Sequence, residues 1–400
     1  MAVDLTTTGP NDEWPTGLDV GELRRSGWNP IAFRVFVVKI HSRCDLACRY
    51  CYMYTLADQS WADKPARMSP ETAAWTARRI AEHAETHGLT SVEVVLHGGE
   101  PLLAGPGLIR DLVEGVRAAC RCRVDVTVQT NGLRLDEEYL DLFDALGVRV
   151  GVSLDGDASA NDRHRVFRDG RPSHRAVTRS LHRMLDGHRH LFAGLLSTVD
   201  LRNDPIGTYE SLLEFGPPAV DFLLPHGTWT DPPPGRPGDA STPYADWLIP
   251  VFDRWYRAPR TTIRLFAEIM HLLLGGASTI ETIGLSPCGV LVVETDGGIE
   301  QSDFLKAAYD GAPLTGLHVA SDPFDVALEL PGVAARQIGL AALADECLSC
   351  PVVSVCGGGL YAHRYRAGAG FRNPSVYCAD LFALIGHIRR TMERDVEMMR

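Results

Sequence analysis

The chain has 400 residues, with 51 acidic residues against 39 lysines and arginines, so its formal net charge is −12. Hydrophobic residues make up 45% and charged residues 22%, which excludes a mostly disordered chain. The acidic balance argues against nonspecific binding to nucleic acid or to a membrane surface. No run of about 18 uncharged apolar residues occurs, so we expect no transmembrane helix.

The segment from Met1 to Trp28 lacks the basic-then-apolar order of a signal peptide. We therefore expect a cytoplasmic protein. That compartment keeps thiols reduced, so the ten cysteines need an explanation other than disulfide bonds.

Residues 1–30 are rich in proline and glycine and predict an irregular arm that lies over the domain surface. From residue 31, short β-branched runs alternate with helical patterns, which predicts parallel strands joined by right-handed crossovers. The predicted strands are Val35–Ile40, Val92–Leu96, Val124–Gln129, Val148–Leu154, Ala193–Val199 and Val220–Leu224. The predicted helices between them cover residues 69–88, 107–119, 136–146, 174–187 and 206–215. Six such repeats form either an open α/β sheet or an incomplete barrel, and the pattern alone does not separate the two.

The breaker-rich segment Asp231–Ser241 predicts the end of this repeated unit. Beyond it the sequence predicts further helices at Tyr244–Tyr256, Ile263–Leu274 and Ala379–Met398, and a strand–turn–strand at Leu291–Ile299. We therefore expect four regions: an arm (1–30), the α/β unit (31–240), a bridge (241–345) and a cysteine-rich C-terminal region (346–400).

Cys44, Cys48 and Cys51 form a Cys-x3-Cys-x2-Cys motif directly after the first predicted strand. In folds built from βα units, the loops after strands carry the active site. Three thiolates can hold a 4Fe–4S cube and leave one iron without a protein ligand, so that a substrate or cofactor can bind there. The alternatives are three metal-free thiols, or a zinc site completed by a distant histidine.

With Tyr50 just before the last cysteine, this motif resembles that of the radical S-adenosylmethionine (SAM) superfamily. His97-Gly98-Gly99-Glu100-Pro101, after the second strand, resembles the GGEP motif of the same superfamily. The resemblance implies a partial (β/α)6 barrel in which this segment holds the amino group of SAM. Glycines let the backbone approach a ligand, and a carboxylate pairs with an ammonium group.

Polar residues also follow later strands, where the resemblance implies contacts with SAM. Each residue has the alternative of a turn or capping role. The residues assigned to SAM in this way are Tyr50, Gly98, Gly99, Glu100, Gln129, Asn131, Ser153, Arg165 and Thr198.

A second group of four cysteines, Cys347, Cys350, Cys356 and Cys378, can close either a zinc site or a 4Fe–4S site. The arrangement resembles the SPASM extension of radical SAM peptide-modifying enzymes, which carries auxiliary iron–sulfur clusters. Where members with two such clusters have further cysteines, this chain has Ser302 and Leu360. We therefore predict one auxiliary cluster, with Cys288 a free thiol and with Cys120 and Cys122 semi-buried thiols.

Longer segments resemble FxsB-type radical SAM/SPASM peptide maturases, from about residue 31 to residue 390. They include DQSW (58–61), GVSLDG (151–156), NDRHR (161–165), DFLLPHGTW (221–229) and PVVSVCGGGLYAHRYR (351–366). The resemblance implies a ribosomally made precursor peptide as substrate and a C–C crosslink from an aromatic ring to a side-chain Cβ, a cyclophane. It also implies an electron donor such as flavodoxin or ferredoxin.

Asp303 is the candidate base for this reaction, because in the related sulfatase-maturating enzymes an aspartate at the corresponding place takes a substrate proton. The alternative is a solvated carboxylate in a turn. Six further side chains could line a peptide channel or simply pack in the interior: His226, Trp229, Tyr361, His363, Arg364 and Tyr365. Leu291–Glu294 offers a possible edge strand for a peptide, and the arm is too short for a winged-helix recognition module.

Other radical SAM modifications of a peptide or protein are the main alternative, namely a thioether crosslink or the oxidation of serine or cysteine to formylglycine. A thioether requires a cysteine in the substrate. A zinc-binding scaffold without catalysis is the non-enzymatic alternative.

Overall fold

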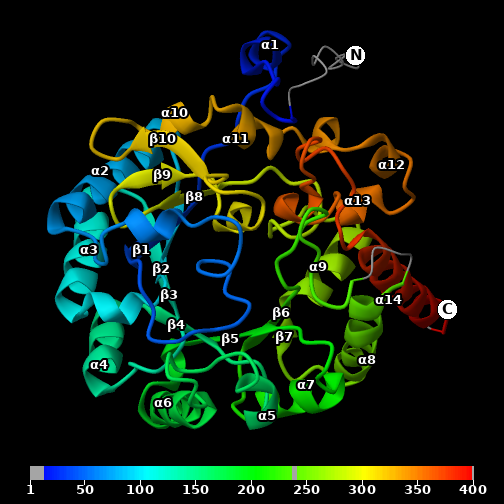
Figure 1. The fold of residues 1–400 in the computed structure, drawn as a ribbon, viewed down its shortest axis with the longest axis horizontal. Helices are drawn as coiled ribbons and strands as arrows, with labels where there is room; N and C mark the ends of the chain where they lie inside the picture. The colour runs from blue at the N-terminus through cyan, green and yellow to red at the C-terminus, as the bar shows by residue number, and fades with distance from the viewer. Residues whose placement is uncertain (1–12, 237–240, 399–400) are drawn as a thin grey trace.

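One sheet of ten strands organises the molecule in a computed structural model that describes residues 13–236 and 241–398. The strand order is β10-β9-β8-β1-β2-β3-β4-β5-β6-β7. Figure 1 shows the strands β1 to β7 curving around a central space, with helices on the outside and the loop after β1 inside the ring. The predicted α/β fold is confirmed, and the curvature gives a partial barrel and not a flat open sheet.

The six predicted strands are confirmed and pair in parallel, each with the next along the chain. They are β1 (Val35–His41), β2 (Ser91–Gly98), β3 (Arg123–Thr130), β4 (Arg149–Ser153), β5 (Phe192–Thr198) and β6 (Ala219–Leu223). Burial alternates along β2, where Val92, Val94 and Leu96 are buried while Val95 and His97 keep some exposed surface. Side chains alternate across a strand, so one face packs under the helices and the other faces the central space.

The sheet extends beyond these six strands at both ends. The short strand β7 (Thr262–Ile263) pairs in parallel with β6, and β8 (Val290–Val293) pairs in parallel with β1. The strands β9 (Gly298–Glu300) and β10 (Leu314–His318) continue antiparallel from β8, which confirms the predicted hairpin. Because β8 has a partner on each side, the prediction that Leu291–Glu294 is a free edge strand for a peptide is wrong.

The predicted helices are confirmed to within a few residues. Ser69 caps α2, its hydroxyl accepting a hydrogen bond from the Thr72 N–H (3.0 Å), and Asp136 caps α4 through the Tyr139 N–H (3.2 Å). The helices of the α/β unit are α2 (Pro70–Thr86), α3 (Pro106–Ala119), α4 (Glu137–Leu146), α5 (Ala158–Asn161), α6 (His174–Gly187) and α7 (Pro205–Leu213). The later helices are α8 (Pro243–Arg257), α9 (Arg264–Leu273), α10 (Phe324–Ala327), α11 (Pro331–Ala335), α12 (Asp345–Leu348), α13 (Val353–Cys356) and α14 (Cys378–Met398).

The described part of the arm packs against the C-terminal half of the chain. It contains α1 (Val20–Arg25), and Trp14 lies in an apolar cluster with Leu305, Tyr361 and Phe371. The Phe371 N–H donates to the Trp14 carbonyl at 3.0 Å. The arm therefore lies over the domain surface as predicted, while residues 1–12 are outside the described residues.

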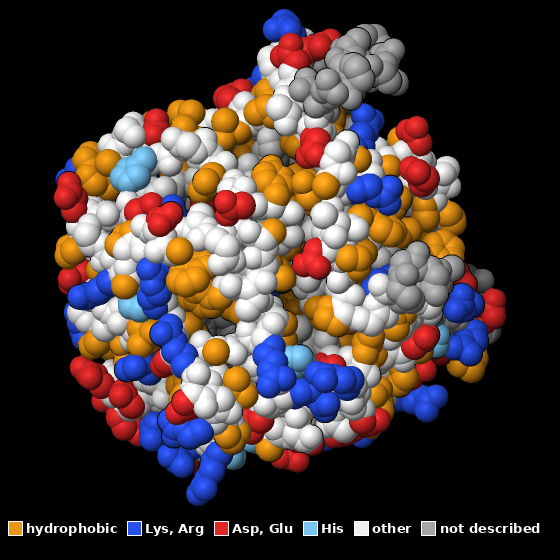
Figure 2. Space-filling view, viewed as in Figure 1, with side chains coloured by type: hydrophobic (Ala, Val, Ile, Leu, Met, Phe, Trp, Pro, Cys, Tyr) orange, Lys and Arg blue, Asp and Glu red, His pale blue; other side chains and the backbone are white. Residues whose placement is uncertain are grey.

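Within the described ranges, no helix is both long and apolar enough to cross a membrane. The predicted linker Asp231–Ser241 is described except for residues 237–240. Beyond it, α8 contacts α7 and α14, and the sheet continues through β7 to β10. In the space-filling view, the centre of the face seen in Figure 1 is hollowed and hydrophobic side chains border the hollow (Figure 2).

Candidate active site

The loop after β1 carries the first three cysteines. The Leu46 N–H and the Asn131 side-chain amide both donate to the Cys44 sulfur, at 3.4 and 3.6 Å. Burial raises the pKa of all three thiols, to about 12 for Cys48, and the charges of Cys48 and Cys51 raise the pKa of their neighbours further. Clustered thiols of this kind become thiolates when they bind a metal centre, because binding releases their protons.

Both groups of cysteines offer thiols alone as ligands. Among the described residues, no three cysteine sulfurs lie within 4.8 Å of one another. An all-thiol donor set fits an iron–sulfur cube, and four thiols also fit zinc.

Glu100 ties the loop after β2 to the loop after β3. Its carboxylate is fully buried and accepts hydrogen bonds from the Leu102 N–H (3.0 Å), the Thr130 hydroxyl (2.7 Å) and the Asn131 N–H (2.8 Å). Burial raises the pKa of Glu100 to about 7 although these donors oppose the rise. A direct contact between Glu100 and an ammonium group stays a prediction. What the geometry establishes is that Glu100 positions Asn131, which contacts Cys44.

Gly98 and Gly99 allow the end of β2 to pass against the start of the cysteine loop. A Cβ at Gly98, where φ is +143°, would lie 2.1 Å from the His41 carbonyl oxygen, and one at Gly99 would lie 2.6 Å from that of Arg43. Both distances are impossible for a real side chain. These glycines therefore hold the cysteine loop in place, and their predicted contact with a ligand remains a prediction.

Asp155, at the end of β4, joins three of the predicted site residues. Its carboxylate accepts hydrogen bonds from the Tyr50 hydroxyl, the Arg165 guanidinium (3.0 Å) and the Thr198 N–H (3.0 Å). Arg165 also lies over the Tyr50 ring, with its guanidinium carbon 5.5 Å from the ring centroid. Sequence analysis did not assign Asp155 a role, although Ser-Leu-Asp-Gly at a strand end was the available signal.

Gln129 and Ser153 form a second pair on neighbouring strands, the Gln129 amide donating to the Ser153 hydroxyl at 3.0 Å. Both keep some exposed surface, and they lie near the carboxyl ends of β3 and β4. The predicted SAM residues thus fall into three adjoining groups along one edge of the sheet, where ligands bind in folds of this type.

Asp303 is buried, which excludes the alternative of a solvated turn carboxylate. One of its oxygens lies 2.5 Å from Lys39 Nζ on β1, and the other accepts a hydrogen bond from the Tyr52 hydroxyl at 3.3 Å. Tyr52 directly follows Cys51. The carboxylate is therefore connected to the cysteine loop through one side chain.

Lys39 and a second lysine, Lys306, are fully buried among carboxylates. Lys39 pairs with Asp303 and with Glu294 (3.1 Å), and Lys306 pairs with Glu294 (3.4 Å), Glu300 (3.1 Å) and Asp58 (3.2 Å). Burial alone would lower the pKa of Lys39, but Asp303 and Glu294 outweigh it and raise that pKa. Sequence analysis missed this network, although a lysine within an apolar strand was a visible signal.

His226 and His363 stand beside this network. The His226 ring lies 5.2 Å from Tyr52, 5.2 Å from Phe304 and 5.8 Å from His363, measured between ring centroids. Burial lowers the pKa of His226 to about 4 and that of His363 well below its ordinary value. Neither His226 Nδ1 nor His363 Nε2 has a hydrogen-bond partner in the part of the chain that the structure describes.

The other proposed channel residues have packing roles. Trp229 donates its indole N–H to the Pro374 carbonyl at 2.7 Å. Tyr361 and Tyr365 lie in the apolar cluster that contains Trp14. Arg364 is buried against backbone carbonyls.

The second cysteine group comes together at α12, α13 and the start of α14. Burial raises the pKa of the thiols of Cys347, Cys356 and Cys378, and nearby cysteines of this group raise each pKa further. Cys347 is buried, Cys350 and Cys356 are half-buried, and Cys378 is exposed. The four thiols therefore lie near one another, and their binding of one cluster stays a prediction.

Cys288 is engaged by an arginine and does not join either set. Arg336 Nη2 lies 2.6 Å from the Cys288 sulfur and pairs with Glu281 at 2.5 Å. Burial raises the pKa of Cys288 to about 12, so it is a protonated thiol at neutral pH. This agrees with its prediction as a free thiol.

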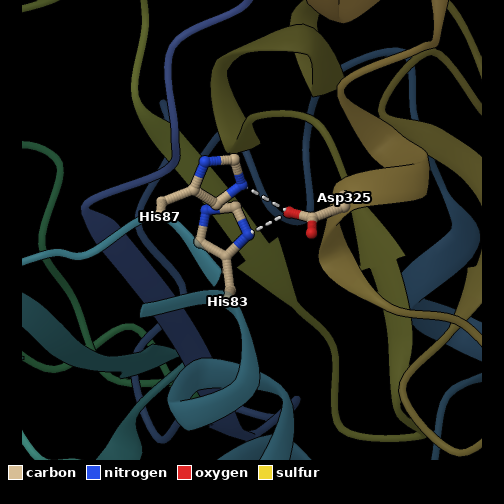
Figure 3. Close-up of side chains that lie close together, drawn as sticks. All are labelled: His83, His87 and Asp325. Atoms are coloured by element: carbon tan, nitrogen blue, oxygen red, sulfur yellow. Dashed lines mark hydrogen bonds and ion pairs between the residues drawn. The ribbon is translucent and has the colours of Figure 1, made fainter. Parts of the chain in front are cut away.

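His83, His87 and Asp325 lie close together, with both histidine rings facing the Asp325 carboxylate (Figure 3). One Asp325 oxygen lies 2.6 Å from His83 Nδ1 and 2.8 Å from His87 Nε2. The Phe33 N–H donates to His83 Nε2 at 2.9 Å, so the His83 proton is on Nδ1 and points at Asp325. A metal on Nδ1 would move the ring proton to Nε2, where it would face the Phe33 N–H, so that two donors would oppose each other. We therefore interpret the group as a hydrogen-bonded link between α2 and α10.

Comparison with known proteins decides the class of this site. A model of the radical SAM superfamily matches residues 38–196, from β1 into β5, and includes the first three cysteines. Residues 38–196 are a radical SAM domain, and the protein is an enzyme. Radical SAM enzymes bind a 4Fe–4S cluster and SAM. Cys44, Cys48 and Cys51 would hold this cluster, and the four C-terminal cysteines would hold an auxiliary one.

Relatives of this protein match it over most of its length. The serine-type anaerobic sulfatase-maturating enzyme of Klebsiella aerogenes is 26% identical over 356 residues, covering 85% of this chain and 82% of that protein. A structure of native anSMEcpe with bound AdoMet has a TM-score of 0.78 at 20% identity, covering 91% of this chain and 99% of that one. Streptococcus suis SuiB bound to precursor peptide SuiA has a TM-score of 0.59 at 13% identity, covering 90% and 78%. At these identities the two structures show the fold alone.

Proposed function

We propose that this radical SAM enzyme oxidises a peptide or protein side chain at its Cβ, with Asp303 as the base. The similarity to a sulfatase-maturating enzyme over 85% of the chain supports a formylglycine-type oxidation of serine or cysteine. The observation that carries the proposal is the buried Asp303 carboxylate, which is paired with Lys39 and linked through Tyr52 to the cysteine loop.

For a serine substrate, the oxidation removes one hydrogen atom, one proton and one electron from the side chain. When bound, the reduced cluster and SAM supply a carbon radical that takes one hydrogen atom from Cβ. The Asp303 carboxylate accepts the hydroxyl proton, and one electron leaves toward the auxiliary site, so that the C–O single bond becomes an aldehyde. Lys39 lies 2.5 Å from Asp303 and holds the carboxylate in position.

The substrate would lie in the central space of the barrel. His226 and His363 offer uncharged ring nitrogens to peptide amides there. We propose that a peptide segment reaches this point past Tyr52 and Phe304, whose rings stand next to His226. A small electron carrier, flavodoxin or ferredoxin, would supply electrons to the enzyme.

A cyclophane crosslink is the second candidate outcome. It is favoured by the resemblance of residues 31–390 to FxsB-type peptide maturases, and it uses the same first step, removal of a Cβ hydrogen atom. The Cβ radical then adds to an aromatic ring, which loses one electron and one proton. Asp303 would accept this ring proton in the same way. The two outcomes differ only in the next step of the Cβ radical, which either loses an electron to become an aldehyde or adds to an aromatic ring.

One experiment separates these outcomes. The enzyme is reconstituted anaerobically with iron and sulfide and incubated with SAM, a reductant and peptides that contain serine, cysteine, or phenylalanine with serine. A serine aldehyde and a crosslink both lose two hydrogen atoms, so mass alone does not separate them. A hydrazide probe labels only the aldehyde, while the crosslink blocks fragmentation between the joined residues.

The remaining alternatives have their own readouts in the same experiment. A thioether forms only on the cysteine peptide and resists alkylation of that thiol. Zinc without iron in the purified protein, together with no cleavage of SAM, would overturn the proposal in favour of a scaffold. Unmodified peptides with SAM still cleaved would place the substrate outside the tested classes and contradict the assigned peptide chemistry.

A further inference from the structure

Arg364 is a buried guanidinium that makes its hydrogen bonds to the backbone and none to a carboxylate. It donates to three consecutive carbonyl groups, those of Gly357 (2.7 Å), Gly358 (3.1 Å) and Gly359 (2.8 Å). No carboxylate oxygen in the described ranges lies within the 4.0 Å of an ion pair with it. The three carbonyl groups and the face of the Tyr361 ring, 5.5 Å from the guanidinium carbon, solvate this charge but do not neutralise it, so an anion held nearby would be stabilised.

The local backbone holds this guanidinium in place. Gly357, Gly358 and Gly359 follow Cys356 directly and all have positive φ, at +59°, +79° and +66°. Left-handed backbone at three consecutive positions requires glycine. A Cβ at Gly358 would lie 2.9 Å from the guanidinium carbon of Arg364, so a side chain there would displace it. The chain therefore places Arg364 at a defined position beside Cys356.

The second cysteine group is the anionic site next to Arg364. Arg364 donates to the carbonyl groups of the three glycines that directly follow Cys356, so its guanidinium lies beside this group. Four thiolates around an oxidised 4Fe–4S core leave a net negative charge, and reduction adds one more.

We propose that Arg364 is the fixed positive charge that balances the auxiliary cluster and raises its reduction potential. A cation beside the cluster stabilises the reduced, more negative state more than the oxidised state, and low polarity strengthens the effect. A higher potential makes the cluster a better acceptor of one electron. The inference rests on the auxiliary cluster and does not depend on whether the product is an aldehyde or a crosslink.

Arg336 provides a matched control, because both arginines line the same pocket of about 460 Å³, a volume that includes its open part. The Arg336 side chain is also buried, with 3% of its surface exposed, but Glu281 neutralises it at 2.5 Å. Removing Arg336 and Glu281 together therefore changes no net charge, whereas removing Arg364 does. Comparing these variants separates the effect of losing a charge from the effect of losing a buried side chain.

The test uses the full chain in a Cys44→Ala/Cys48→Ala/Cys51→Ala background, so that only the auxiliary cluster contributes to the spectrum. Anaerobic redox titration followed by electron paramagnetic resonance measures its midpoint potential in Arg364→Met, Arg364→Lys and the Arg336→Met/Glu281→Gln double variant. We expect a lower potential for Arg364→Met, a smaller decrease for Arg364→Lys and no change for the double variant. Iron content and unfolding free energy are measured on the same samples.

Each outcome bears on the proposal. Arg364→Met with full iron and an unchanged potential would overturn it. If Arg364→Met holds no iron while Arg364→Lys assembles the cluster, the positive charge is required and the proposal stands. If both variants lose the cluster equally, or both keep it with the wild-type potential, Arg364 serves only the glycine turn and the electrostatic role is wrong.

Discussion

Lys39 and Asp303 form a buried ion pair that joins the first strand of the barrel to the segment after β9, with 2.5 Å between Nζ and the nearer carboxylate oxygen. The two residues are far apart in the chain, and β8 brings them together by pairing in parallel with β1. The same contact therefore closes the sheet at one side of the barrel and orients the candidate base toward the cysteine loop.

Replacing Lys39 by methionine removes the cation between two buried carboxylates. We expect the free energy of unfolding to fall by about 3–5 kcal/mol, because Asp303 would be left as an uncompensated buried charge and Glu294 would keep only Lys306 as a partner. Urea denaturation of the anaerobic protein measures this. The control is Lys64→Met, whose pair with Asp296 (2.9 Å) is partly exposed and should contribute at most about 1 kcal/mol. Equal losses in the two variants would contradict a special role for the Lys39 network.

Replacing Asp303 by asparagine keeps the shape of the side chain and removes the proton acceptor. We expect product formation to fall about 10²- to 10⁴-fold, while SAM is still cleaved to 5′-deoxyadenosine in the absence of product. Chromatography of both products measures the ratio. Asp296→Asn, in the nearby turn, is the control and should keep the ratio of the wild type. If Asp303→Asn couples the two products as the wild type does, another group takes the proton.

Much of the fold could be predicted because local signals and tertiary packing agree. Ser69 before Pro70 and Asp136 before Glu137 fix the first turns of two helices through backbone hydrogen bonds, which depend only on neighbouring residues. The pairing of β8 with β1 could not be predicted in this way. It joins segments some 250 residues apart, and no local pattern in Val290–Val293 distinguishes an edge strand from an interior one.

The candidate site was predictable to the same degree. The cysteine motifs predict which thiols form each group, because thiols at these short spacings can reach one metal centre. The partners of Asp303 and Asp155 were not visible, because their burial depends on cations from other strands and loops. A lysine among Val37, Val38 and Ile40 has to find a buried anion, so Lys39 was a signal that sequence analysis could have used.

The stabilisation contributed by the buried histidines should decrease as the pH falls below about 6.5, the ordinary pKa of histidine, while Glu100, whose pKa burial raises, acts in the opposite direction. Burial lowers the pKa of His226 to about 4 and also lowers the pKa of His97 and His363. The folded state therefore holds these rings neutral while the unfolded state binds protons below pH 6.5, so the stabilisation is complete above that pH and is lost as the pH falls toward 4. For His226 alone we expect a loss of about 3 kcal/mol between pH 7 and pH 4. Urea unfolding at several pH values tests this, and His226→Phe should flatten the dependence.

The two cysteine groups should act independently. Replacing Cys44, Cys48 and Cys51 by alanine should lower the iron content from about eight to about four atoms per chain and abolish cleavage of SAM, because the cluster that binds SAM is lost. Replacing Cys347 and Cys356 by alanine should also leave about four irons, yet SAM cleavage should continue without product. Cys120→Ala, at a thiol packed against the main core, is the control and should keep all the iron. Cleavage of SAM by the first triple variant would reverse the roles assigned to the two groups.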